Sequence, residues 1–326
     1  MKLPLAVTLA WALLVSTNCS RTADLLHYQK NDGALVHTVE HKLKELQGEK
    51  KVDILWVIDN SGSMGDHQDN LITNMDFFIN EFVKNNLEWK MGLISTSEYE
   101  NPFIGFTPSS LLTFQTPNGV DLFRKAIARL GINGATTEMA FTPIVNTLKG
   151  YSTFARSDAK LAVIIVTDAR EQSYKDEVQD VLDQLVATKG SLKRVTAYGV
   201  FGAEDKGCPD NSSEGHWKYV GSTYESFITT LHGKTYSLCA ADFWKNLVDM
   251  GKDLVKQIQY ARIYLAERPV PSSIKVICKG EEIQGGQESE GGHWIYDFEL
   301  NAIIFSDTNF AAGDDESVRV EFTPVL

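Results

Sequence analysis

Between residues 51 and 258, short apolar runs alternate with longer amphipathic stretches, and this alternation constrains the fold more than any other feature of the sequence. The apolar runs lack a strict every-second-residue pattern, so both faces of each strand are expected to be covered. Strands covered on both faces are typical of parallel sheets, in which helices connect one strand to the next. Four runs are therefore predicted to be strands: 53–58, 90–95, 161–166 and 194–201.

The stretches between these runs repeat their apolar residues at the spacing of a helix with one buried side. The predicted helices are 71–83, 122–130, 178–186 and 243–258. Alternation of strands and helices predicts an open, doubly wound α/β fold with a mostly parallel sheet, which we assign to residues 51–262.

The pattern changes after Arg262. Apolar residues now occur at every second position in three segments, which predicts strands with one exposed face. We therefore expect a small antiparallel, sandwich-like β domain over residues 263–326. The mixed, charged residues 19–50 are expected to form a tether with a short helix.

The first 18 residues have the features of an export signal. Lys2 supplies a positive charge, an apolar run too short to span a bilayer follows, and small or polar residues lead to Cys19. This arrangement resembles the signal of bacterial lipoproteins, which implies that Cys19 is acylated. The resemblance also implies the outer membrane, because Ser20 stands where an aspartate commonly retains lipoproteins in the inner membrane. An ordinary cleaved signal is the alternative, and it predicts export as well.

An oxidising compartment favours disulfides among the remaining cysteines. Cys208 and Cys239 both lie in polar, turn-rich sequence, and we predict that they pair. Closing this loop would stabilise the fold by roughly 3–4 kcal/mol in the chain-entropy model. Cys278 shares a predicted strand face with Ile274 and Val276, so we expect it to be a buried, unreactive thiol.

The net charge of −12 bears on the choice of partner. Phosphate binding needs clustered Lys and Arg, and the chain has no basic run that could supply it, so the charge argues against nucleic acid. An acidic surface instead attracts cations.

Oxygen-bearing side chains follow the first predicted strand. Asp59 comes directly after it, and Ser61 and Ser63 follow at alternate positions, so the three side chains are expected to project to one side. Ligands of open α/β sheets bind at this end of the strands. Gly62 and Gly65 allow the chain to bend before the next helix. Carboxylates and hydroxyls without sulfur or imidazole suit a hard cation, with Mg²⁺ or Mn²⁺ preferred over Ca²⁺.

Two further segments offer suitable oxygen atoms. The loop "NGATTEM" (133–139) precedes another predicted helix and contains Thr136 and Thr137, and the third strand ends on Asp168. Together with the D-x-S-x-S motif, this order of residues resembles the von Willebrand factor A domain and its metal-ion-dependent adhesion site. The resemblance covers the predicted α/β domain and implies five ligands: Asp59, Ser61, Ser63, Thr136 and Asp168. Thr137 takes the place of Thr136 if the loop register differs by one.

The resemblance also implies a function. Neutral hydroxyl donors leave the cation under-neutralised, so one coordination position is open to an acidic group of a partner protein or surface. We therefore expect a module for metal-dependent adhesion or protein recognition on the bacterial envelope, without catalytic turnover. Six residues are candidates for the rim that contacts the partner: Met64, Asp66, His67, Tyr99, Arg170 and Glu171.

Other interpretations of the same residues stay open. The D-x-S-x-S residues are also favoured helix caps, although a cap does not require the threonine loop or Asp168. Asp59 and Asp168 around Mg²⁺ would also suit a phosphatase or another hydrolase. Against it, a phosphoaspartate enzyme would need a second aspartate where Ser61 stands. An envelope scaffold is a further alternative.

A second motif lies in the predicted tether. "HTVEH" (37–41) fits the H-x-x-E-H pattern of some metallopeptidases, in which two histidines lie one helical turn apart. Short motifs of this kind arise readily by chance, so an exposed helical turn is the simpler interpretation.

Overall fold

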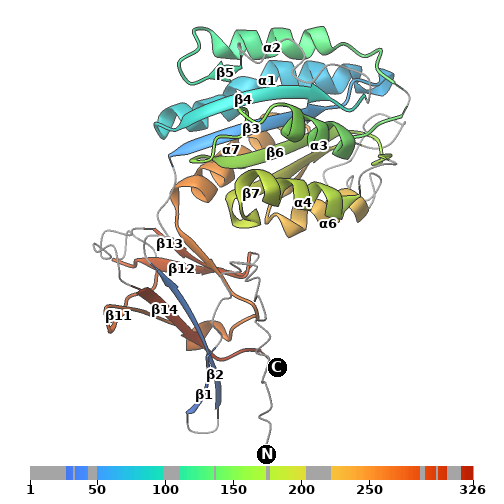
Figure 1. Cartoon of the computed structure of the whole chain (residues 1–326). Helices are drawn as coiled ribbons and strands as arrows, with labels where there is room; N and C mark the ends of the chain where they lie inside the picture. Colours follow the sequence, from blue (N-terminus) through green and yellow to red (C-terminus); the bar gives the residue numbers. More distant parts are fainter. Residues whose placement is uncertain are drawn as a thin grey trace, which may run out of the picture.

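In the computed structural model, the described residues are 27–31, 34–42, 50–97, 111–135, 137–173, 177–202, 222–286, 291–298, 300–306 and 317–325. They form an α/β lobe and a β lobe (Figure 1). No helix in this part of the chain combines the length and the apolar character needed to cross a membrane. The predicted export signal and Cys19 lie outside the described residues, so they stay predictions.

The α/β lobe is built on six strands: β3 Lys51–Ile58, β4 Glu88–Ser95, β5 Leu112–Thr113, β6 Lys160–Thr167, β7 Val195–Phe201 and β8 Thr235–Ser237. They form one sheet in the order β5-β4-β3-β6-β7-β8. All neighbours are parallel except β5, which pairs antiparallel with β4 at the edge. The four predicted strands are confirmed as β3, β4, β6 and β7. The two edge strands were not predicted because two or three residues carry no periodic signal.

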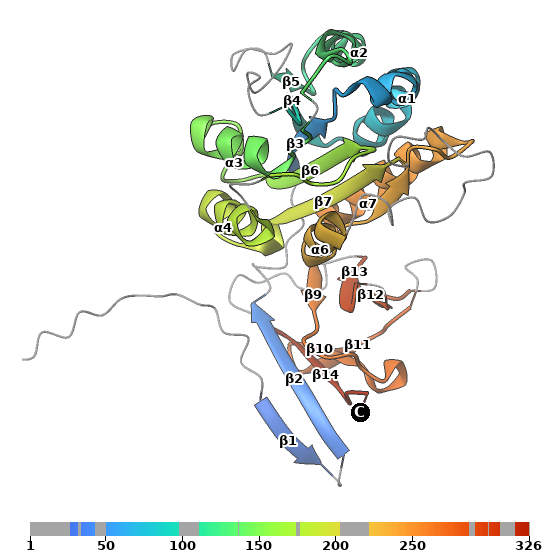
Figure 2. The ribbon, with the colours of Figure 1, turned by 90° about the vertical axis from the view of Figure 1, so that its right-hand side faces the viewer.

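Helices cover both faces of this sheet, as a doubly wound fold requires. They are α1 Gly65–Lys84, α2 Gly119–Leu130, α3 Phe141–Gly150, α4 Val178–Lys189, α6 Ser222–Thr230 and α7 Phe243–Gln259. On one face α1 contacts α2 and α7, and on the other α3 contacts α4 (Figure 2). Single 3-10 turns occur at Gly62–Met64, Leu192–Arg194 and Pro271–Ser273. The predicted doubly wound α/β fold is confirmed.

Both faces of the central strand β3 are buried, and aromatic rings cover the face beneath α1 and α2. Trp56 is fully buried and meets Phe78 of α1 and Phe123 of α2 edge-on, with ring centroids 5.1 and 5.5 Å apart. Because both faces of the strand are buried, its sequence shows no alternation. This packing makes the carboxyl end of β3 a rigid support for the residues that follow it.

The β lobe consists of two antiparallel sheets. The strands are β1 His27–Asn31, β2 Ala34–Lys42, β9 Arg262–Tyr264, β10 Lys275–Cys278, β11 Glu281–Ile283, β12 Trp294–Asp297, β13 Ala302–Phe305 and β14 Ser317–Phe322. One sheet has the order β1-β2-β14-β10-β11 and the other β12-β13-β9. Val276, Ile303 and Val320 belong to the small apolar core of this lobe. The antiparallel β structure predicted after Arg262 is therefore confirmed.

The segment before the α/β lobe differs from its prediction. The tether with a short helix expected at 19–50 is wrong for the described part of that segment, which forms β1 and β2. β2 pairs with β14 from His37 opposite Phe322 to Lys42 opposite Ser317. The strand arises by pairing with the other end of the chain, which no local pattern records. It also separates the two histidines of "HTVEH" along an extended chain, so the helical turn and the metallopeptidase arrangement are both wrong.

The α/β lobe is inserted between strands of the β lobe, because β2 precedes it and β9 follows it. At the junction the His232 ring, in the turn between α6 and β8, stacks on the Tyr264 ring of β9. Their centroids are 4.0 Å apart and the planes differ by 15°. One aromatic contact therefore joins the two lobes directly.

The cysteines agree with their predictions as far as the structure describes them. Cys239 is disulfide-bonded, and its predicted partner Cys208 lies outside the described residues, so the pairing itself stays a prediction. Cys278 is a thiol in β10 with 4% of its surface exposed, as expected.

Candidate metal-binding site

The first predicted ligand lies where β3 ends, at the carboxyl edge of the sheet. The backbone N–H of Asp59 donates to the Val166 carbonyl oxygen at 2.9 Å, which continues the pairing with β6. The Asp59 carboxylate is fully buried. Its Oδ1 accepts the Ser61 backbone N–H at 2.8 Å, and its Oδ2 accepts the Thr167 hydroxyl at 2.6 Å. Two donors thus hold the carboxylate in one orientation.

Two serines connect the end of β3 to the end of β6. The Oγ atoms of Ser61 and Ser63 are 3.1 Å apart, and Ser63 Oγ donates to Asp168 Oδ1 at 3.0 Å. Asp168 is buried, whereas Ser61 is half-buried and Ser63 is exposed. The structure therefore brings Asp59, Ser61, Ser63 and Asp168 together. The fifth predicted ligand, Thr136, lies outside the described residues.

Buried polar contacts hold the loop in which the threonines lie. The Gly134 N–H donates to the Asn60 carbonyl oxygen at 2.8 Å. The Ser97 hydroxyl donates to Asn60 Oδ1 at 2.9 Å and accepts the Ala135 N–H at 3.1 Å. A Cβ on Gly134 would lie 2.2 Å from Asn60 Oδ1, so glycine lets the loop approach this closely. Asn60 and Ser97 were not predicted, because only the folded loop shows that they support it.

A further acidic residue, Glu138, lies beside the predicted ligands. Only 2% of its surface is exposed, and Thr96 Oγ1 donates to its Oε2. Burial, and then the neighbouring charge of Asp59, raise the pKa of Glu138 to about 8. The sequence analysis missed this residue. The one available signal was its position, directly after the two threonines of the loop.

The donor set fits a hard divalent cation. It combines the buried carboxylates of Asp59 and Asp168 with two hydroxyls that reach the surface. Among the described residues no Lys or Arg forms an ion pair with Asp59, so its buried charge lacks a protein counter-charge. Burying a carboxylate is unfavourable unless the charge is compensated, and a cation would compensate it. In the same part of the chain, no three His, Cys, Asp or Glu side chains are arranged to hold a metal ion.

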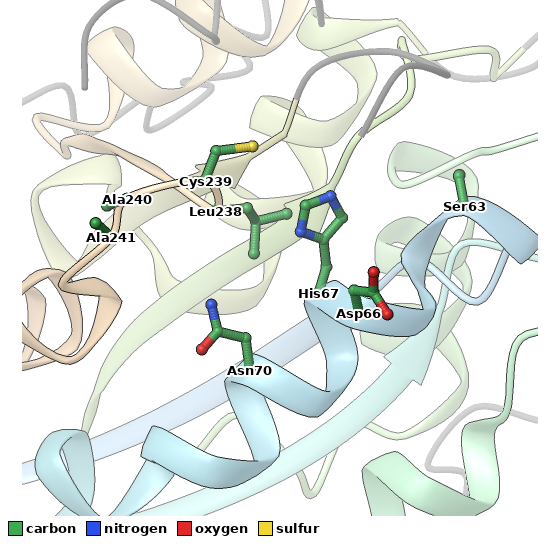
Figure 3. A pocket seen from close by; sticks show the side chains of 8 residues that line it. All are labelled: Ser63, Asp66, His67, Asn70, Leu238, Cys239, Ala240 and Ala241. Carbon is green, nitrogen blue, oxygen red and sulfur yellow. The ribbon is translucent and has the colours of Figure 1, made fainter. Parts of the chain in front are cut away.

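A cavity of about 430 Å³ adjoins Ser63. It lies between the beginning of α1 and the segment that follows β8, and Asp66, His67 and Cys239 are among its lining residues (Figure 3). The His67 ring extends from α1 toward this segment. Burial lowers the pKa of His67, which favours the neutral ring. The site thus has a recess next to one of its hydroxyl donors.

The structure divides the predicted rim residues. His67 lines the recess but is itself buried, with 5% of its surface exposed. Asp66 and Arg170 are exposed, as a rim requires, and Tyr99 lies outside the described residues. The prediction for Met64 is wrong, because its side chain has no exposed surface and belongs to the core. Glu171 is half-buried, and its carboxylate accepts hydrogen bonds from the backbone N–H groups of Ala140 and Ser173. Both of its oxygen atoms are therefore already used within the protein.

Residues 53–207 match the family model of the von Willebrand factor type A domain. This part of the chain is a von Willebrand factor type A domain. The matched range contains all of the predicted ligands and Glu138. Strand β8 and helix α7 lie beyond the match; β8 extends the same sheet, and α7 packs against α1. No curated protein matches the chain.

Three solved structures resemble the chain distantly. A von Willebrand factor type A protein from Catenulispora acidiphila is 14% identical, with a TM-score of 0.43, 91% of this chain covered and 68% of that chain. Proximal thread matrix protein 1 from the mussel byssus is 13% identical, with a TM-score of 0.46, and the match covers 67% of this chain and 50% of that chain. The pilus adhesin SpaC from Lactobacillus rhamnosus GG is 15% identical, with a TM-score of 0.41, and the match covers 91% of this chain and 42% of that chain. The chain thus spans half or less of the length of the last two.

Proposed function

We propose that the protein is a recognition module that binds an acidic group of a partner through a divalent cation. The observation that carries this proposal is the convergence of Asp59, Ser61, Ser63 and Asp168 at the carboxyl edge of the sheet. The type A domain supplies the support, and these residues are the ones that its adhesion-site pattern implies. Mg²⁺ or Mn²⁺ is the proposed ion, because the donors are oxygen atoms.

The different burial of the donors determines from which side a partner would reach the cation. The carboxylates lie beneath the surface, and the serine hydroxyls lie between them and solvent. A cation held there would offer its remaining coordination position to an acidic group from outside. The recess beside Ser63 would take a neighbouring side chain of the same partner, with polar contacts from Asp66 and neutral His67. The proposed partner is therefore a protein or surface ligand with an exposed Asp or Glu.

The proposal includes a location and excludes turnover. The N-terminal signal favours an exported protein, anchored at the outer membrane through Cys19, facing the periplasm or the cell surface. Ser61 stands where a phosphoaspartate enzyme would need its second aspartate, which favours binding over hydrolysis. Metal-dependent turnover of a generic phosphatase substrate that is lost in Asp59→Ala would overturn the binding proposal.

The metal requirement is tested by thermal unfolding with Mg²⁺, Mn²⁺ or chelator. We expect both ions to raise the midpoint of the parent protein, since a ligand that binds only the folded state stabilises it. The double variant Ser61→Ala/Ser63→Ala should lose this increase, while its midpoint in chelator stays close to that of the parent. Ser157→Ala/Ser272→Ala, at two exposed serines outside the site, should keep the increase. Equal stabilisation of the parent and the site variant would contradict the proposal.

The partner is sought by capture from envelope extract with the intact protein, with and without chelator. Proteins retained by the parent but lost both in chelator and in Asp59→Ala are the expected result. If the same proteins are retained with and without chelator, recognition through the cation is contradicted.

A further inference from the structure

The recess of about 430 Å³ beside Ser63 carries an acidic side chain. It is lined by the beginning of α1 and by the segment after β8, and its lining residues are Ser63, Asp66, His67, Asn70 and 238–241. Asp66 is the one acidic residue among them, and no described Lys or Arg lines the recess. The Asp66 side chain is exposed and forms no ion pair with a Lys or Arg of the described residues. The recess therefore favours a cationic group over an anionic one.

The wall across the recess from α1 is largely apolar. Leu238, Ala240 and Ala241 lie there, opposite Asp66 and Asn70 (Figure 3). A recess with a carboxylate on one side and apolar surface on the other suits a side chain that has an apolar stem and a charged end. Lys and Arg have this build, because their methylene stems pack on apolar surface while their charged ends reach polar groups.

Hydrogen bonds hold both walls of the recess in place. The Leu238 N–H donates to a carbonyl oxygen of β7 at 2.9 Å, and Asn246 Nδ2 of α7 donates to the Ser237 carbonyl oxygen at 2.9 Å. Cys239 is disulfide-bonded, and its N–H donates to Ser237 Oγ at 3.1 Å. On the other side, Gln68 Nε2 of α1 donates to the carbonyl oxygen just after β3 at 2.8 Å. A side chain that enters a preformed recess has less ordering to offset, which favours binding.

The recess lies directly beside the proposed cation site. Ser63 lines it, and Ser63 Oγ also donates to Asp168 Oδ1 at 3.0 Å. The His67 ring is close to the same carboxylate residue, since a Cβ on Gly202 would lie 2.9 Å from Asp168 Cβ and 3.3 Å from His67 Nε2. One short segment of a partner can therefore reach the cation and the recess together.

We propose that the recess binds a Lys or Arg side chain from the partner segment whose Asp or Glu reaches the cation. This inference rests on the proposed function and names the chemistry of the second contact. The stem lies along the apolar wall, and the ammonium or guanidinium group pairs with Asp66. The net charge of −12 supports this choice, because the protein repels a purely acidic segment at long range, whereas a neighbouring basic residue compensates that repulsion.

The test is a selection from short peptides displayed on phage, with a glutamate fixed at the centre and random residues on both sides. The peptides are bound to the whole protein in Mg²⁺ and eluted with chelator. We expect Lys or Arg to be enriched at a fixed distance from the glutamate. Selection on Asp66→Asn should lose this enrichment. The matched control is Asp69→Asn, at an exposed aspartate of α1 outside the recess, which should keep it.

Fluorescence anisotropy then compares a selected peptide with a version that has Gln in place of the basic residue. On the parent, the Gln version should bind about 3- to 5-fold more weakly, the upper range for an ion pair open to solvent. On Asp66→Asn the two peptides should bind alike. A weaker hold on the cation would affect both peptides equally, so the ratio of their dissociation constants reports the recess alone.

Two results would overturn the inference while the proposed function stands. One is a set of chelator-eluted peptides without enriched Lys or Arg, and the other is an equal ratio of dissociation constants on the parent and on Asp66→Asn. If no peptide is retained in Mg²⁺ and released by chelator, both the inference and the proposed function are contradicted.

Discussion

Gly134 shows how one small residue determines the position of the threonine loop. Its N–H contacts the backbone of Asn60, and a methyl group in its place would collide with the Asn60 side chain. Asn60 cannot easily move aside, because its Oδ1 accepts the Ser97 hydroxyl and it is 1% exposed. The proposed cation ligand Thr136 is two residues further along the sequence.

Gly134→Ala should therefore reduce both stability and cation binding. We expect a loss of roughly 1–3 kcal/mol in the free energy of unfolding, the usual cost of overpacking, and weaker binding of Mn²⁺. Denaturant titration and Mn²⁺ titration measure the two effects. Gly150→Ala is the control, because a Cβ at the end of α3 meets no atom within 4 Å. Unchanged Mn²⁺ affinity in Gly134→Ala would show that the loop does not contribute to the site.

At the scale of elements, a charged cluster holds the opposite end of the sheet. Asp53 of β3 is fully buried and accepts the Arg156 Nε–H at 2.8 Å, and Lys90 of β4 lies 3.9 Å from the same carboxylate. Arg156 also pairs with Glu88, where β4 begins. Burial raises the pKa of Asp53 although Lys90 and Arg156 act against it. The cluster fixes the turn before β6 against β3 and β4.

Asp53→Ala should destabilise the α/β lobe by about 3 kcal/mol, because it removes the buried carboxylate that the half-buried Arg156 and Lys90 share. Cation binding should be unchanged, since the site lies at the other end of the strands. Denaturant unfolding and Mn²⁺ titration together test both statements. Asp158→Ala removes an exposed pair with Lys51 and should leave stability nearly unchanged. Weakened Mn²⁺ binding in folded Asp53→Ala would contradict the separation of the two ends.

At the scale of the whole molecule, the lobes meet through the stacked rings of His232 and Tyr264. Burial, and then the positive charges of Arg262 and Lys160, lower the pKa of His232 below its usual 6.5. The folded state therefore favours the neutral ring, and protonation opposes folding. This contribution to stability is complete above about pH 6.5 and is lost as the pH falls toward the lowered pKa.

The pH dependence of thermal unfolding tests this contact. Between pH 7.5 and about 5, the parent should lose more stability than His232→Asn, which has no group that titrates in this range. Asparagine is a suitable replacement because the backbone φ at this position is +53°, a conformation that asparagine tolerates. Identical pH profiles for the two proteins would show that His232 does not couple acidification to stability.

The sequence by itself determined the features that local patterns encode. The buried strands of the α/β lobe and its amphipathic helices were predicted, because covered strands and half-buried helices have different apolar periods. The positions of Asp59 and Asp168 followed from the ends of those strands, and the structure places these residues together with Ser61 and Ser63.

Only the tertiary structure decided what depends on contacts between distant segments. β2 is a strand because β14, near the other end of the chain, pairs with it. Met64 is buried because the turn before α1 folds inward onto the core, although its neighbours reach solvent. In each case the deciding contact joins residues that are far apart in the sequence. A local sequence pattern does not record such a contact, so it is visible only in the folded structure.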